Sequence, residues 1–166
     1  MSKKRYFVDM DGVLAKYEFN LPSYDMLYEE GYFLNRPMQP NIVDAVCQLL
    51  AADEDVYVLS AVLKDSEYAL FEKHEWLDRH MNIACRRRLF TICGEDKINF
   101  VPAFNPETDI LVDDYGPNCK IWADHGGRYV KVSVDAKDAE YEKTRHDHVI
   151  NPDMPAQKIL NQILAI

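Results

Sequence analysis

Residues 5–14, RYFVDMDGVL, decide the fold that we expect of this chain. The run over 5–9 is rich in aromatic and β-branched residues and is nearly continuous in its apolar character, which is typical of a strand covered on both faces. Asp9 and Asp11 close this run, and Gly12 permits a tight backbone turn just past them. A lone Asp-x-Asp after a strand is usually a turn or a cap, so its meaning depends on what ends the other strands.

Further runs of the same kind alternate with helical patterns along the chain. Strands are predicted at 5–9, 56–60, 89–93, 109–113 and 128–134, and helices at 40–53, 65–81 and 155–166. Because strands and helices alternate, we expect an α/β fold with a parallel sheet and right-handed crossovers. Residues 15–39 interrupt the alternation and are rich in Tyr, Phe, Pro, Asn and Gly, so we interpret them as an insertion over the edge of the sheet. Residues 1–166 are otherwise expected to form a single domain.

Composition narrows the class of protein. The net charge of -9 argues against a nucleic-acid polymer as partner, because that binding needs a basic face. No apolar run approaches the ~20 residues that span a bilayer, so no membrane association is expected. The start reaches Asp9 before a signal peptide can develop, which predicts a cytoplasmic location. The four cysteines have no Cys-x-x-Cys spacing, and reduced thiols are expected rather than zinc or disulfides.

Polar side chains end or closely follow four of the predicted strands. In an open α/β sheet, ligands bind beyond the carboxyl ends of the strands, so these side chains are predicted to meet at one rim. Crowded carboxylates repel one another and call for a cation, and an all-oxygen site suits Mg²⁺. The residues concerned are Asp9 with Asp11, Ser60, Lys97, and Asp113 with Asp114.

This set of side chains suits phosphoryl transfer. Asp9 is the expected nucleophile, attacking phosphorus as carboxylates do in aspartyl-phosphate chemistry. Asp11 is placed to protonate the leaving group and later to activate water. Ser60 and Lys97 would donate to the phosphoryl oxygens, where charge must be stabilised. With Mg²⁺ held by Asp9 and Asp114, the sequence predicts a magnesium-dependent phosphatase acting on a small phosphate monoester.

In their order, these residues resemble the four motifs of the haloacid dehalogenase-like (HAD) superfamily. DMDGVL at 9–14 resembles the first motif, Ser60 the second, Lys97 the third, and VDD at 112–114 the fourth. The resemblance implies a Rossmann-like, five-stranded parallel sheet of order 5-4-1-2-3, with helices on both faces and a small cap after the first strand. It also implies Mg²⁺ held by the Asp9 side chain, the Asp11 carbonyl and Asp114, with Asp113 orienting or ligating through water.

A closer resemblance is to the 5'(3')-deoxyribonucleotidases. It is carried by GYFLNRPMQPNIVDAV at 31–46, VYVLSAVLK at 56–64, YALFEKHEWL at 68–77, EDK at 95–97 and ILVDD at 110–114. This likeness implies a nucleotidase of cytoplasmic type, acting on a deoxynucleoside monophosphate as a monomer or homodimer. The residues it implies around the substrate are Gly12, Ser60, Ala61, Leu63, Lys64 and Lys97, with Phe33 as a wall for the base.

The alternatives concern the substrate and the chemistry. Only 48 residues, positions 12 to 59, lie between Asp11 and Ser60, so the cap is short and the open site also suits sugar phosphates or other small monoesters. A receiver domain is disfavoured, because the third strand ends LFTIC without an aspartate. A non-catalytic metal-binding module would not need both Asp9 and Asp11.

Two further features allow more than one interpretation. The tyrosines of the insertion, with Phe33, form either a base-stacking platform or the insertion's own small core. The His146-Asp147-His148 motif has metal-like spacing, but it is more simply a solvent-facing turn.

Overall fold

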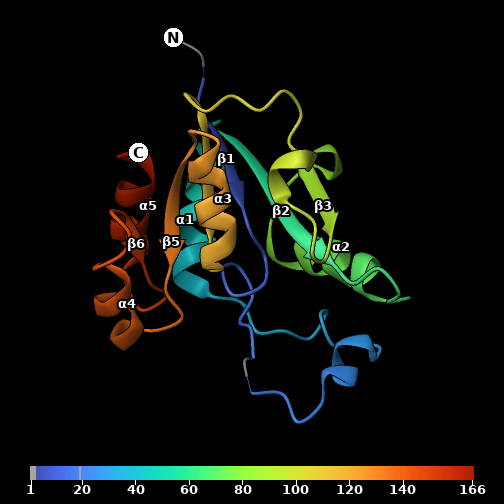
Figure 1. Ribbon diagram of the computed structural model, residues 1–166. Helices are drawn as coiled ribbons and strands as arrows, with labels where there is room; N and C mark the ends of the chain where they lie inside the picture. Colours follow the sequence, from blue (N-terminus) through green and yellow to red (C-terminus); the bar gives the residue numbers. More distant parts are fainter. Residues whose placement is uncertain (1–2, 19) are drawn as a thin grey trace.

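A computed structural model describes residues 3–18 and 20–166 of the chain (Figure 1). Its centre is a six-stranded parallel sheet of order β3-β2-β1-β4-β5-β6. This order contains the expected 5-4-1-2-3 arrangement, but the sheet has one strand more than predicted. The strands are β1 (Arg5–Val8), β2 (Asp55–Val62), β3 (Arg88–Ile92), β4 (Asp109–Asp113), β5 (Arg128–Val132) and β6 (Val149–Ile150).

The additional strand, β6, corrects the five-stranded prediction. It pairs Val149 with Lys131 and Ile150 with Val132 at the edge beyond β5. Two residues are too few to produce a recognisable period in a sequence, which is why this strand escaped notice.

Helices cover both faces of the sheet, as expected. They are α1 (Pro40–Ala51), α2 (Ala69–His80), α3 (Gly116–Asp124), α4 (Ala136–Glu142) and α5 (Ala156–Leu164). One face, including Tyr6 and Val8, packs against α1, α2 and α5. The opposite face, including Phe7, packs against Trp122 of α3. Within the described residues, no helix is long and apolar enough to cross a membrane.

One predicted helix begins later than expected, and two helices were not predicted. The helix expected over 65–81 begins at Ala69, because Ser66 stays in the preceding turn and its hydroxyl accepts hydrogen bonds from the Tyr68 and Ala69 amides. Helices α3 and α4 were not predicted at all. α3 begins with Gly116-Pro117, and proline in a first turn is a recognised start signal.

The two ends of the predicted insertion over 15–39 lie side by side. Ala15 forms an antiparallel bridge with Met38, and the Lys16 amide donates to the Pro37 carbonyl at 2.8 Å. Between these ends, the described part includes a 3-10 helix, η1 (Tyr24–Tyr28). In Figure 1 the insertion, in blue, lies beyond the ends toward which the strands point. It therefore lies on the side of the sheet where the site was predicted.

The insertion is fastened to α2. Tyr32 and Phe33 are buried together with Ala69. The buried carboxylate of Glu72 accepts hydrogen bonds from the amides of Gly31, Phe33 and Leu34. A carboxylate that accepts several backbone donors holds a turn firmly, so this part of the insertion has a fixed place.

Candidate active site

The loop that follows β1 folds into a compact turn. The Met10 carbonyl accepts from the Leu14 amide at 2.9 Å and from the Ala15 amide at 2.8 Å, while the Gly12 amide donates to the Ala15 carbonyl at 2.8 Å. Gly12 has a φ of +79°, which side chains disfavour. A Cβ at this position would also overlap the Asp114 carboxylate. Glycine is required here for both the turn and the close approach of Asp114.

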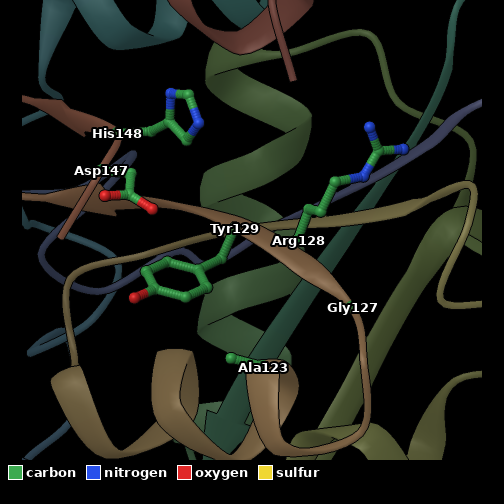
Figure 2. A pocket seen from close by; sticks show the side chains of 6 residues that line it. All are labelled: Ala123, Gly127, Arg128, Tyr129, Asp147 and His148. Atoms are coloured by element: carbon green, nitrogen blue, oxygen red, sulfur yellow. The ribbon is translucent and has the colours of Figure 1, made fainter.

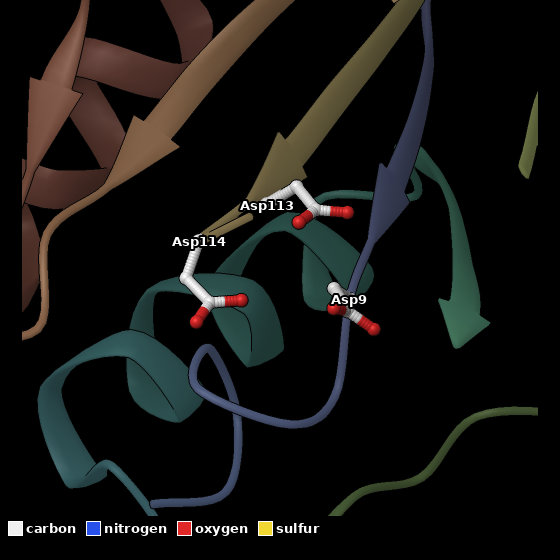
Figure 3. A group of neighbouring side chains, drawn as sticks. All are labelled: Asp9, Asp113 and Asp114. Atoms are coloured by element: carbon white, nitrogen blue, oxygen red, sulfur yellow. The ribbon is translucent and has the colours of Figure 1, made fainter. Parts of the chain in front are cut away.

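Three carboxylates meet where β1 and β4 end (Figure 3). The strands pair Val8 with Val112, and the Asp9 amide donates to the Val112 carbonyl at 2.9 Å, so Asp9 and Asp113 leave the sheet side by side. One carboxylate oxygen from each of Asp9, Asp113 and Asp114 lies within 4.8 Å of the others. The predicted convergence of Asp9 with the Asp113–Asp114 pair is present.

Lys97 joins this cluster from η3 (Lys97–Phe100). Its ammonium lies 2.9 Å from Asp9 Oδ2 and 2.7 Å from Asp113 Oδ2. The other Asp113 oxygen accepts from the Tyr115 amide at 2.8 Å, and Asn118 Nδ2 donates to Oδ2 at 3.0 Å. Asp113 is fully buried and its hydrogen-bonding capacity is largely used. It therefore acts to hold Lys97 in place.

Asp114 is the carboxylate that remains available. Across residues 3–18 and 20–166, its side chain makes no hydrogen bond or ion pair. Its backbone is fixed instead, because Lys131 Nζ donates to the Asp114 carbonyl at 2.6 Å. Asp9 also accepts from the Met10 amide through Oδ1 at 2.7 Å. The two carboxylates suited to share a cation are thus Asp9 and Asp114.

The charges of the cluster are unevenly balanced. Burial would lower the pKa of Lys97, but the carboxylates of Asp113 and Asp9 outweigh burial and raise it. Burial raises the pKa of Asp113. Burial also raises the pKa of Asp114 well above its usual value, and the charges of Asp9 and Asp113 add to this rise. Keeping these acids ionised is costly without a further cation, and their all-oxygen donor set fits Mg²⁺.

Asp11 lies beside the cluster and has a different partner. Its carboxylate pairs with Lys73, a fully buried lysine of α2. The same ammonium donates to Ser60 Oγ at 3.2 Å and to the Ala61 carbonyl at 2.5 Å. Burial raises the pKa of Asp11, while the nearby Lys73 charge opposes this rise. A raised pKa suits a carboxyl group that must donate a proton.

Lys73 was missed by the sequence reasoning. It lies on the buried face of α2 with Ala69, Trp76 and Leu77. A lysine within the apolar stripe of an amphipathic helix is the signal that would have identified it, because a buried charge requires a partner.

A cavity of about 390 Å³ opens over the cluster. Some of its lining residues were predicted to belong to the site. Tyr115 and Asn118 were not, because α3 was not predicted. The lining consists of Asp9, Asp11, Tyr17, Tyr24, Ala61, Lys97, Asp114, Tyr115 and Asn118.

The remaining predicted substrate residues do not line this cavity. Ser60 is fully buried behind it, within reach of Lys73. Phe33 is 5% exposed, and the Lys73 ammonium lies 4.8 Å from the centre of its ring. Leu63 packs against the buried cluster around Phe33, and Lys64 is exposed. The tyrosines of the insertion therefore divide, since Tyr32 joins the core while Tyr17 and Tyr24 line the cavity.

A second cavity, of about 300 Å³, lies at β5 and contains none of the predicted site residues (Figure 2). Asp147 and His148 line it. His146 is engaged nearby, with Nε2 3.1 Å from Glu142 Oε2 and Nδ1 2.8 Å from the Tyr129 hydroxyl. In the part of the chain that the structure describes, these residues form no metal-like cluster, unlike Asp9, Asp113 and Asp114.

Two solved structures have the same fold along their whole lengths. One is the D,D-heptose 1,7-bisphosphate phosphatase from Burkholderia thailandensis, with 16% identity, a TM-score of 0.62, and coverage of 99% of this chain and 100% of that one. The other is the B. bronchiseptica enzyme of the same name, complexed with magnesium and phosphate, with 13% identity, a TM-score of 0.59 and 98% coverage of both chains.

At this identity, the likeness establishes the fold alone, a parallel α/β sheet covered by helices on both faces. No family model matches the sequence, and no curated protein matches it.

Proposed function

We propose that the chain is a Mg²⁺-dependent phosphomonoester hydrolase that works through an aspartyl-phosphate on Asp9. The observation that carries this proposal is the convergence of Asp9, Asp114 and Lys97 on one cavity, with Asp11 beside them. The nucleophile, the acid and the charge-stabilising group required for phosphoryl transfer thus line a single space.

Each residue has a distinct part in the reaction. The Asp9 and Asp114 carboxylates, with the Asp11 carbonyl, would hold Mg²⁺, which would supply positive charge that offsets the repulsion between a carboxylate and an anionic phosphate. An Asp9 oxygen forms a bond to phosphorus as the bond from phosphorus to the leaving oxygen breaks. Asp11 gives its proton to that leaving oxygen, which departs as an alcohol.

The second step regenerates the enzyme. Asp11, now ionised, takes a proton from a water molecule whose oxygen attacks phosphorus. The bond between phosphorus and the Asp9 oxygen breaks, inorganic phosphate leaves, and Asp9 is again a carboxylate. Lys97 stabilises negative charge on the phosphoryl oxygens, and Asp113 keeps Lys97 directed at Asp9.

Sugar phosphates or similar small monoesters are the substrates that we favour. The two similar structures are named for phosphatases of a sugar bisphosphate, D,D-heptose 1,7-bisphosphate, and a short insertion would leave the site open to esters other than nucleotides. The 5'(3')-deoxyribonucleotidase reading has the sequence motifs at 31–46 and 56–64 in its favour but no support from the similar structures. A panel of hexose phosphates and deoxynucleoside monophosphates, compared by kcat/KM, distinguishes the two readings.

Phosphate release from this panel, with and without Mg²⁺, tests the proposed chemistry. Asp9→Asn is expected to abolish release. Asp11→Asn is expected to slow it about 100- to 10,000-fold while Mg²⁺ binding persists. Asp44→Asn, at an exposed position of α1, is the matched control and should match the parent. Unimpaired turnover by the Asp9→Asn protein would rule out the mechanism.

A further inference from the structure

The walls of the active-site cavity are strongly unequal in charge. Three carboxylates line it, those of Asp9, Asp11 and Asp114, against the single ammonium of Lys97. That ammonium is already engaged by Asp9 and Asp113. One divalent ion would neutralise the net charge of these four side chains, and the transferring phosphate would make the charge of the site negative again. Among the described residues that line the cavity, no cation is left to receive a second anionic group of a substrate.

The mouth of the cavity is instead aromatic. Tyr24, from the insertion, is 75% exposed, and Tyr115, at the start of α3, is 59% exposed. These rings come from segments about ninety residues apart in the sequence and line the same cavity. Ligand cavities commonly combine aromatic walls with a few polar groups that fix orientation. Exposed rings at such a mouth offer flat surfaces for a ring-shaped ligand.

Lys73 lies just behind the lining, but its ammonium is committed to Asp11, Ser60 and the Ala61 carbonyl. Further cations line a neighbouring cavity of about 560 Å³, which shares only Asp114 with the active-site cavity. Each of these cations already has a protein partner. Lys120 lies 2.6 Å from Asp124, Lys131 donates to the Asp114 carbonyl, and Arg145 donates to the Tyr141 hydroxyl at 2.7 Å. This neighbouring cavity is therefore not a prepared subsite for a second phosphate.

We infer that the enzyme selects a monophosphate whose remaining part is an uncharged ring, contacted by Tyr24 and Tyr115, and discriminates against bisphosphates. The inference rests on the proposed phosphatase function and adds a substrate class to it. An uncharged sugar ring and a nucleoside share the required chemistry, namely a neutral ring attached to one phosphate that can lie against an aromatic side chain, through its C–H groups in a sugar and through the face of the base in a nucleoside. A second phosphate on either would face the carboxylates of the cavity or the solvent.

The first test compares matched substrates on the intact protein with Mg²⁺. The pairs are glucose 1-phosphate with glucose 1,6-bisphosphate, and deoxyadenosine 5'-monophosphate with its 3',5'-bisphosphate. In the preferred pair, kcat/KM should be at least tenfold higher for the monophosphate. The pair with the higher values identifies the ring as sugar or nucleoside.

The second test asks whether the tyrosines contact the ring. Ethyl phosphate serves as a substrate without a ring. Tyr24→Ala and Tyr115→Ala should each raise KM for the ring monophosphate, lowering its kcat/KM relative to ethyl phosphate about three- to tenfold. Phenylalanine at either position should restore the ratio. Tyr28→Ala, in the same η1 segment but outside the cavity lining, and Tyr141→Ala, on α4, are exposed controls that should leave the ratio unchanged.

Several outcomes would overturn the inference. Equal or better turnover of the bisphosphates would do so while leaving the phosphatase function intact. A bisphosphate preference that disappears in Arg145→Met would place the second phosphate in the neighbouring cavity. Equal effects of the tyrosine variants on ethyl phosphate and on ring substrates would show that the rings do not contact the ligand. Absence of phosphate release from every ester would remove the proposed function itself, and this inference with it.

Discussion

Replacing Gly12 by alanine should separate backbone strain from damage to the metal site. Gly12 and Gly126 both have left-handed backbones, with φ of +79° and +83°. A Cβ at Gly126 would lie 3.4 Å from the Pro106 Cβ, an ordinary contact, whereas a Cβ at Gly12 would overlap the Asp114 carboxylate. Gly126→Ala is therefore a matched control that shares the strain but not the overlap.

The magnitudes differ in kind. A left-handed backbone costs a residue with a side chain about 1–2 kcal/mol, so both variants should unfold a few degrees below the parent, at about 2–4 °C per kcal/mol. Only Gly12→Ala should displace Asp114. Since changes even to groups that merely support a metal ligand weaken metal binding about 10- to 100-fold, we expect at least this loss in Mg²⁺ affinity.

The assay combines thermal unfolding with a Mg²⁺ titration followed by calorimetry and by phosphate release. Gly126→Ala should keep the Mg²⁺ affinity and turnover of the parent, whereas Gly12→Ala should lose both. Equal Mg²⁺ affinity in the two variants would show that Asp114 is not a metal ligand for which Gly12 makes room.

Three more variants test separate parts of the structure. Burial raises the pKa of Asp114 in the folded chain. Between the unfolded pKa of ~3.9 and this raised pKa, the folded chain binds more protons than the unfolded chain, so the stability of the metal-free protein falls as pH rises through that range. Asp114→Asn should therefore have a higher melting temperature than the parent in EDTA at pH 7. Its melting temperature should depend less on pH between pH 5 and 8, and Mg²⁺ should not raise it. Arg5→Met leaves the fully buried Asp109 without its two-point partner, and urea unfolding should show a loss of about 3–5 kcal/mol. Lys73→Met should misplace Asp11, the proposed acid. In single-turnover assays, alcohol release from alkyl phosphates needs that acid and should slow at least tenfold more than release of dinitrophenol from its phosphate ester. Equal slowing of both would indicate a structural role for Lys73.

The position of the site was predictable because strand ends are readable. Asp9 and Asp113 directly follow or end apolar runs, and parallel strands bring their carboxyl ends to one edge of a sheet. The strand end predicted at Ser60 was wrong, because β2 continues to Val62 and leaves Ser60 buried within the strand. The convergence of Asp9 and Asp113 follows from that geometry, whereas Lys97 reaches them from η3, beyond the end of β3.

The different positions of Asp113 and Asp114 do not follow from the residue pattern, although the HAD resemblance implied that Asp114 would be the ligand and that Asp113 would orient or ligate through water. β4 is buried along its whole length, so the sequence carries no alternation that tells which aspartate faces inward. The structure separates them: Asp113 is buried against Lys97, while Asp114 faces Gly12 and the cavity.

Long-range partners set the other limit. Lys73 and Asp11 are 62 positions apart, and nothing local in the sequence pairs them. The sixth strand and α4 are too short to stand out by period. For α3, the proline near its start is a signal from which the helix could have been predicted.

Acid quenching of a single turnover tests the central claim most directly. The protein is mixed with a saturating phosphate monoester and Mg²⁺, stopped in acid within milliseconds, reduced with borohydride and digested with trypsin. If the proposed mechanism is right, Asp9, in the peptide spanning 6–16, carries the phosphoryl group before reduction and becomes homoserine after it. Phosphate release at full rate with Asp9 unmodified at every time point would contradict it.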